Sequence, residues 1–100
     1  MHFLEEIKKL KQEFKKEGFI IEGVFGSYAR GEATKQSDID ILYSLEEKFY
    51  KEKGFEAIIR LNEIKEYLAK KLKTPSVDLA PKNALSKTAK KYILKEIIYV

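Results

Sequence analysis

Three aspartates are the residues of this chain whose type and spacing best suit chemistry. Asp38 and Asp40 stand two apart in an alternating apolar segment, so in a strand both carboxylates point to the same face. Asp78 lies between Val77 and Leu79 in another apolar segment. Carboxylates held side by side repel one another, and a hard divalent cation such as Mg2+ relieves that repulsion by taking oxygen ligands. If the two segments form adjacent strands, three carboxylates meet at one metal site.

A Gly-Ser pair directly follows an apolar segment. Gly26 lets the backbone approach a ligand closely, and Ser27 offers a hydroxyl and an N–H to phosphate oxygens, although it could also serve as a turn cap. Arg30 is as well placed to contact a phosphate as to pair with Glu32. Together with carboxylate-bound metal ions, these groups suit phosphoryl or nucleotidyl transfer. Asp78 is also a candidate to accept the proton of an attacking hydroxyl.

The elements that must position these residues follow the order helix, strand, strand, helix, strand, helix. The first helix is predicted by an apolar stripe at helical spacing, Phe3, Ile7, Leu10 and Phe14. The predicted strands span residues 19–25, 38–45 and 76–80, and the later helices span 57–72 and 86–100. Residues 26–37 are predicted to form a loop or a loop entering a helical turn, and residues 46–57 a charged connection.

Some details of these elements are also predicted. Pro75 ends the second long helix, and Pro81 prevents simple extension of the third strand. Phe49 and Tyr50, in the charged connection, are candidates for exposed interface residues. The core faces of the later helices are expected to carry Ala57, Leu61, Ile64, Leu68 and Leu72, and then Ala89, Tyr92, Ile93 and Ile97.

The element order predicts an α+β fold, in which a small mixed sheet has helices packed mainly on one face. Residues 1–100 are expected to form one domain, since the chain has 100 residues and an ordinary hydrophobic content of 44%. The chain has no cysteine, which excludes disulfides, thiolate metal sites and cysteine nucleophiles. With no apolar run of about 20 residues and no signal-peptide pattern, a cytoplasmic protein without a membrane span is expected.

Charge is unevenly distributed along the chain. The net charge is +4, but residues 1–50 carry −2 and residues 51–100 carry +6. A basic half favours polyanionic partners such as triphosphates, nucleic acid or an acidic protein face, whereas lysine-rich helices with solvated outer faces are the simpler explanation. Nucleic acid is the weakest of these partners, because no known RNA- or DNA-binding module is visible.

The Gly-Ser pair and the two aspartates after it also match the motif of a known protein family. Gly26-Ser27, ten intervening residues and then Asp38-Ile39-Asp40 resemble the signature of the nucleotidyltransferase superfamily that includes DNA polymerase beta. The short chain and the sequence GSYARGEA resemble those of the minimal nucleotidyltransferases, and the similarity extends from about residue 19 to the end. This resemblance implies that Asp38, Asp40 and Asp78 hold one or two Mg2+ ions. It also implies that Gly26 and Ser27 hold the triphosphate of ATP.

The resemblance further implies a partner. Minimal nucleotidyltransferases commonly pair with small helical HEPN proteins, as antitoxin to a ribonuclease toxin, and such enzymes transfer AMP from ATP to a tyrosine of the toxin. A complex or a homo-oligomer is therefore expected. The alternative is a binding module that neutralises a HEPN partner by contact, without chemistry. No added substrate domain of the kind that polymerases carry is expected, which favours an acceptor brought by another protein.

Overall fold

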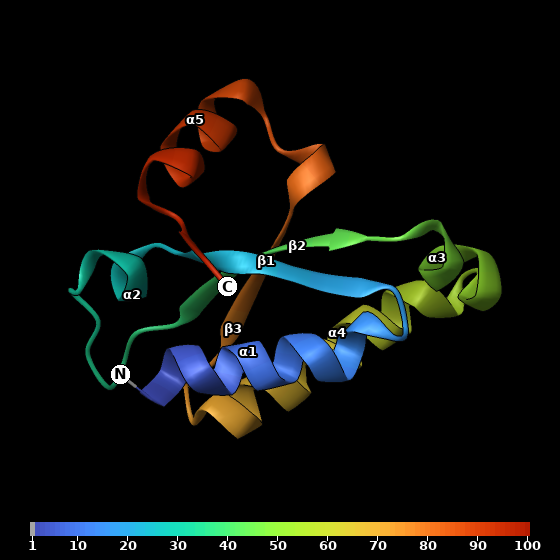
Figure 1. Ribbon diagram of the computed structural model, residues 1–100, viewed down its shortest axis with the longest axis horizontal. Coiled ribbons are helices and arrows are strands. Elements are labelled where there is room, and N and C mark those ends of the chain that lie inside the picture. Colours follow the sequence, from blue (N-terminus) through green and yellow to red (C-terminus); the bar gives the residue numbers. More distant parts are fainter. Residues whose placement is uncertain (1) are drawn as a thin grey trace.

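The computed structural model describes residues 2–100 and places four strands in one mixed sheet (Figure 1). The helices are α1 (His2–Lys15), α2 (Ser27–Arg30), α3 (Glu47–Lys53), α4 (Glu56–Leu72) and α5 (Lys87–Glu96), with a 3-10 turn η1 (Lys82–Ala84). The strands are β1 (Phe19–Phe25), β2 (Ile39–Leu45), β3 (Val77–Pro81) and β4 (Ile98–Tyr99). Their order in the sheet is β3-β2-β1-β4, so β1 and β2 are central.

Strand directions explain how distant aspartates become neighbours. β1 pairs with β2 in antiparallel fashion, whereas β2 and β3 are parallel and are joined through α3 and α4. A parallel pair needs such a crossover, because the chain must return to the same end of the sheet. The predicted α+β class and mixed sheet are thereby confirmed.

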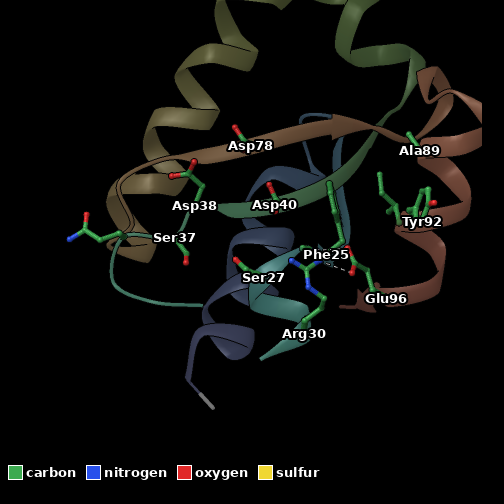
Figure 2. A pocket seen from close by; sticks show the side chains of 13 residues that line it. Phe25, Ser27, Arg30, Ser37, Asp38, Asp40, Asp78, Ala89, Tyr92 and Glu96 are labelled. Atoms are coloured by element: carbon green, nitrogen blue, oxygen red, sulfur yellow. Dashed lines mark hydrogen bonds and ion pairs between the residues drawn. The ribbon is translucent and has the colours of Figure 1, made fainter. Parts of the chain in front are cut away.

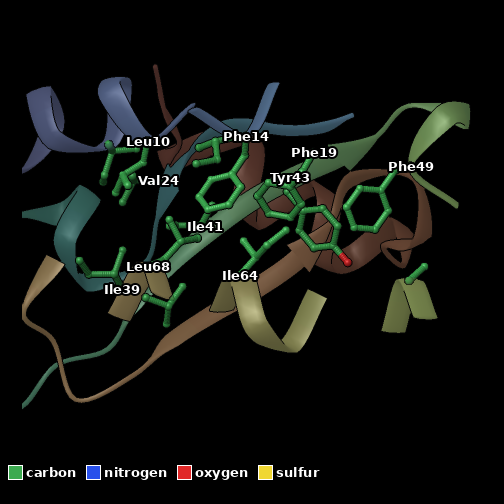
Figure 3. Packing of buried hydrophobic residues seen from close by; sticks show 14 residues of the cluster. Leu10, Phe14, Phe19, Val24, Ile39, Ile41, Tyr43, Phe49, Ile64 and Leu68 are labelled. Carbon is green, nitrogen blue, oxygen red and sulfur yellow. The ribbon is translucent and has the colours of Figure 1, made fainter. Parts of the chain in front are cut away.

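The hydrophobic core lies between the sheet and the helices α1 and α4, which cover the same face (Figure 1). Residues from four elements interdigitate there, including Phe14, Phe19, Ile41 and Leu68 (Figure 3). α5 lies on the other side of the sheet (Figure 1). The prediction of helices mainly on one face therefore holds for the two long helices, and the opposite face is left for α5 and a pocket.

A β-bulge in β1 reverses the alternation of its side chains. Ile21 pairs with Tyr43, but the next paired residue is Gly23, opposite Leu42, so Glu22 is the extra residue. Before the bulge the odd-numbered residues face the core, whereas after it Val24 is buried there. Phe25 consequently lies on the opposite face, next to the Gly-Ser pair.

Two predictions about the connections were wrong. Phe49 is fully buried, because residues 47–53 form helix α3 and turn this ring against Phe19; Tyr50 is half exposed, as predicted. The third strand also extends through Pro81, which pairs with Tyr43. β3 is an edge strand, and proline is tolerated there because one side of the strand needs no ladder partner.

The end of the chain also differs from the prediction. The last helix begins at the Ser86 cap, whose hydroxyl accepts a hydrogen bond from the Ala89 N–H at 3.1 Å, but it ends at Glu96. Ile98 and Tyr99 then form a fourth strand against β1. Tyr92, expected in the core, is 68% exposed, because α5 buries mainly Ile93. No helix within residues 2–100 is both long and apolar enough to cross a membrane.

Candidate active site

Asp40 and Asp78 are brought together by the register of two parallel strands. Asp40 of β2 lies directly beside Asp78 of β3, and Asp38 precedes β2 by one residue. These are all the aspartates of the chain, although aspartate is depleted in strands generally. Their placement at one end of two adjacent strands favours a role in chemistry over a role in folding. Figure 2 shows the three side chains along one side of a pocket.

Gly26 lies against the Asp40 carboxylate. Phe25 pairs with Asp40 across β1 and β2, so the following residue turns over the end of β2. Gly26 has φ +75°, a conformation that L side chains rarely adopt, and a Cβ on it would overlap the Asp40 carboxylate. Both the backbone conformation and the contact with Asp40 require glycine at this position. The close approach also places the backbone of the turn beside any ligand that the Asp40 carboxylate binds.

The electrostatics of the site show that negative charge is crowded. Burial, followed by the charge and hydrogen bonding of Asp78, raises the pKa of Asp40 to about 6. Asp38 and Glu96 add smaller contributions in the same direction. A carboxyl that loses its proton this reluctantly is one that a bound cation would stabilise in its charged form.

The donor set suits Mg2+ or another hard divalent cation, because every acidic group is an oxygen ligand. Within the described part of the chain, no three acidic or histidine side chains are close enough to form a preorganised metal centre. Asp40 and Asp78 are neighbours, whereas Asp38 enters from the preceding loop (Figure 2).

Arg30 of α2 forms two ion pairs. Its Nε lies 2.8 Å from Glu32 Oε1, and its Nη1 lies 2.9 Å from Glu96 Oε2. Pairing with Glu32, one of the two predicted alternatives, is therefore present in this structure. These carboxylates raise the pKa of Arg30, and the hydrogen bond from Arg30 holds the pKa of Glu96 below its usual range.

Glu96 was missed from the sequence, yet it joins the end of α5 to the Gly-Ser turn. Its Oε1 accepts a hydrogen bond from the Gly26 N–H at 3.0 Å, while its other oxygen pairs with Arg30. A carboxylate from the chain itself thus occupies two donors of the predicted triphosphate site. No motif marks this residue, although it is the single acidic residue of α5 in a segment rich in lysine.

The pocket has a volume of about 630 Å3 and two unlike walls. Gly26, Ser27, Asp38, Asp40 and Asp78 form the polar wall, and Ser27 lies on it without capping α2. Ala89, Tyr92 and Ile93 of α5, together with Phe25, form an apolar wall (Figure 2). Pockets of this size and mixed character accommodate nucleotide-sized ligands. The apolar wall was also missed, since Tyr92 was assigned to the core.

A mixed sheet that sets a glycine-serine turn against strand-borne carboxylates is the arrangement of a nucleotidyltransferase. The model of the family described as "Nucleotidyltransferase domain" matches residues 5–100. The chain belongs to this nucleotidyltransferase domain family and is a nucleotidyltransferase enzyme.

Individual relatives agree with this assignment. The chain is 39% identical to the protein adenylyltransferase MntA of Thermococcus cleftensis, over 97% of this chain and 95% of that protein. It is 37% identical to a Methanocaldococcus jannaschii protein whose name proposes the same activity, over 93% of this chain and 85% of the relative. A solved structure described as a proposed minimal nucleotidyltransferase superposes with a TM-score of 0.70 at 27% identity, covering 97% and 95% of the two chains.

Proposed function

We propose that this enzyme transfers AMP from ATP to the hydroxyl of a tyrosine on a partner protein, joining the α-phosphate to the tyrosine oxygen and releasing pyrophosphate. The partner in this proposal is a small helical HEPN ribonuclease toxin, and its modification makes the enzyme an antitoxin. The observation that carries the proposal is the pairing of Asp40 with Asp78 beneath the Gly26 turn, in an open pocket of nucleotide size. The name of the Thermococcus relative supports a protein as acceptor.

Each wall of the pocket has a role in this proposal. Asp38, Asp40 and Asp78 hold one or two Mg2+ ions, which neutralise the triphosphate and the charge that develops during transfer. The Ser27 N–H and hydroxyl contact phosphate oxygens, the Gly26 N–H does so when phosphate displaces the Glu96 carboxylate, and Arg30 supplies a fixed positive charge nearby. Tyr92 and its apolar neighbours accommodate the base.

The most exposed of the three aspartates is the one that accepts the proton of the attacking hydroxyl. Asp78 is exposed, whereas Asp38 and Asp40 are only partly so. An attacking hydroxyl that approaches from solvent meets this carboxylate first, and Asp78 accepts its proton. Asp40 is less exposed and lies against the Gly26 turn, so this carboxyl is better placed for a cation than for an incoming hydroxyl.

The test uses the purified chain, ATP, Mg2+ and the protein encoded beside it, read by intact mass. We expect the partner to gain one or more AMP units, and Asp40→Asn to abolish the gain. Glu66→Gln, an equal change of charge on the exposed side of α4, is the control and should transfer normally. Equal transfer by Asp40→Asn and the parent would rule out the metal assignment.

A contact antitoxin is the competing function, and one surface favours it. Phe55 is 96% exposed, and Ile58 and Ile59 beside it are also largely exposed. Apolar side chains gathered at one end of α4 suit a protein interface. If Asp40→Asn still neutralises the toxin in cells while Phe55→Ser does not, inhibition by contact replaces the catalytic proposal.

A further inference from the structure

Helix α5 differs from the other long helices in its charge. α1 and α4 intersperse basic residues with three glutamates each, whereas α5 carries four lysines and one glutamate. That glutamate, Glu96, is turned toward Gly26 and Arg30. None of the α5 lysines forms an ion pair with any residue from 2 to 100, so no carboxylate in this part of the chain neutralises their positive charge.

Three of these lysines lie on one face of the helix. Lys87, Lys91 and Lys95 recur every four residues, which places them in a row about 12 Å long. With Thr88 and Tyr92 they line a shallow groove of about 350 Å3. All three lysines are exposed. We call this surface, formed by Lys87, Lys91 and Lys95, the lysine row.

The lysine row adjoins the active-site pocket. Tyr92 lines both the groove and the pocket that contains Asp40 and Asp78, so the two hollows share one side chain. A molecule that delivers a hydroxyl to Asp78 and also rests on α5 therefore lies across the lysine row. This is the position at which an acceptor makes contacts beyond its reacting residue.

We infer that the lysine row binds an acidic segment of the protein that carries the acceptor tyrosine. The inference rests on the proposed function and names the chemistry by which the acceptor is recognised. Charge complementarity selects the segment, because a row of lysines beside a carboxylate-rich pocket attracts an acidic strand or helix and orients it. Nucleic acid fits less well, since a row of three lysines is short compared with the six to ten phosphate contacts of typical strong binders.

The experiment measures binding to a fluorescein-labelled peptide that consists of glutamates and one tyrosine, by anisotropy and without ATP. We expect the triple variant Lys87→Gln, Lys91→Gln, Lys95→Gln to bind about tenfold more weakly, because each exposed ion pair changes affinity by about two- to threefold. A triple variant on α1, Lys8→Gln, Lys9→Gln and Lys15→Gln, removes the same charge from exposed positions on the other face of the sheet. It should bind as the parent does.

Equal binding by the α5 variant and the parent would overturn the inference. So would tighter binding of a single-stranded RNA of matched charge that is lost in the α5 variant, because the lysine row would then be a nucleic-acid site. Since this assay needs no ATP, it reports on the surface even if the chain transfers no AMP. Where transfer does occur, the α5 variant should raise the KM for the acceptor protein about tenfold and leave the KM for ATP unchanged.

Discussion

Gly26 leaves no room for a side chain beside the Asp40 carboxylate. The turn that follows β1 passes so close to β2 that a Cβ would overlap the acid, and its φ of +75° disfavours any other residue. The position is thus constrained twice, by backbone conformation and by contact with the group most central to the site.

Gly26→Ala should therefore lower the free energy of unfolding more than Gly31→Ala does. We expect a loss of about 1–3 kcal/mol in the free energy of unfolding and a loss of Mg-ATP binding, measured by urea denaturation and calorimetry. Gly31→Ala is the control for a positive φ, because Gly31 has φ +74° and nothing within 4 Å of its added Cβ, although its ψ of 20° is less restrictive than the ψ of −152° at Gly26. If both variants behave alike, conformation alone accounts for Gly26.

Replacement of Asp40 should stabilise the metal-free protein at neutral pH. Because the pKa of Asp40 rises from 3.8 to about 6 in the folded state, the folded chain binds a proton more tightly than the unfolded chain does. The stability that this proton contributes is present below pH 3.8 and is lost as pH rises through about 6. Asp40→Asn, which carries no charge, should raise Tm at pH 7 and give the parent's Tm near pH 3.5.

Magnesium should reverse that ranking. We expect Mg2+ to raise the Tm of the parent at pH 7, because a cation that binds only the folded chain stabilises it. It should leave the Tm of Asp40→Asn unchanged, and chelation with EDTA should restore the parent to its metal-free value. An equal rise for the two proteins would mean that the cation binds elsewhere.

Tyr92 should contribute to nucleotide affinity through its ring rather than its hydroxyl. Tyr92→Ala is expected to weaken Mg-ATP binding by about 1–3 kcal/mol, the usual range for a base stacked on an aromatic side chain, whereas Tyr92→Phe should bind normally. Tyr99→Ala removes a similarly exposed ring from the edge strand β4 and serves as the control. Calorimetric titration with ATP measures all three, and normal binding by Tyr92→Ala would place the base elsewhere.

Two isoleucines of α4 provide a test of the fold. Ile64 is fully buried against the sheet, whereas Ile58, six residues earlier, is 73% exposed. Ile64→Ala should lower the free energy of unfolding by about 2–5 kcal/mol, and Ile58→Ala by less than about 0.5 kcal/mol. Similar losses at the two positions would show that α4 presents a different face to the core.

Local pattern in the sequence was enough to predict the longer elements. The stripe from Phe3 to Phe14 and the apolar face of residues 57–72 have the helical period, and the segments around Asp40 and Asp78 are apolar enough to predict strands. Because the Gly-Ser turn and the aspartates lie within or beside these segments, the candidate site could be predicted with them.

Features that depend on tertiary pairing could not be predicted in this way. Ile98 and Tyr99 continue an apolar helical pattern, and only the unpaired edge of β1 makes them a strand. Phe49 lies among charged residues, so nothing local indicates that α3 turns it inward. Glu96 belongs to the site only because α5 ends against the Gly26 turn, 70 residues away in sequence.

The bulge at Glu22 also limits how this sequence can change in length. If Glu22 paired regularly with Leu42 instead of bulging out, every later residue of β1 would shift by one place, so Val24 would turn out of the core and Phe25 would move into it. The Gly-Ser turn would then leave the sheet on the face opposite the carboxylates. Deletion of Glu22 alone would keep the present pairing, so any other change in the length of β1 should be rare among active relatives. The connection between β2 and α4, which positions no aspartate, can vary in length.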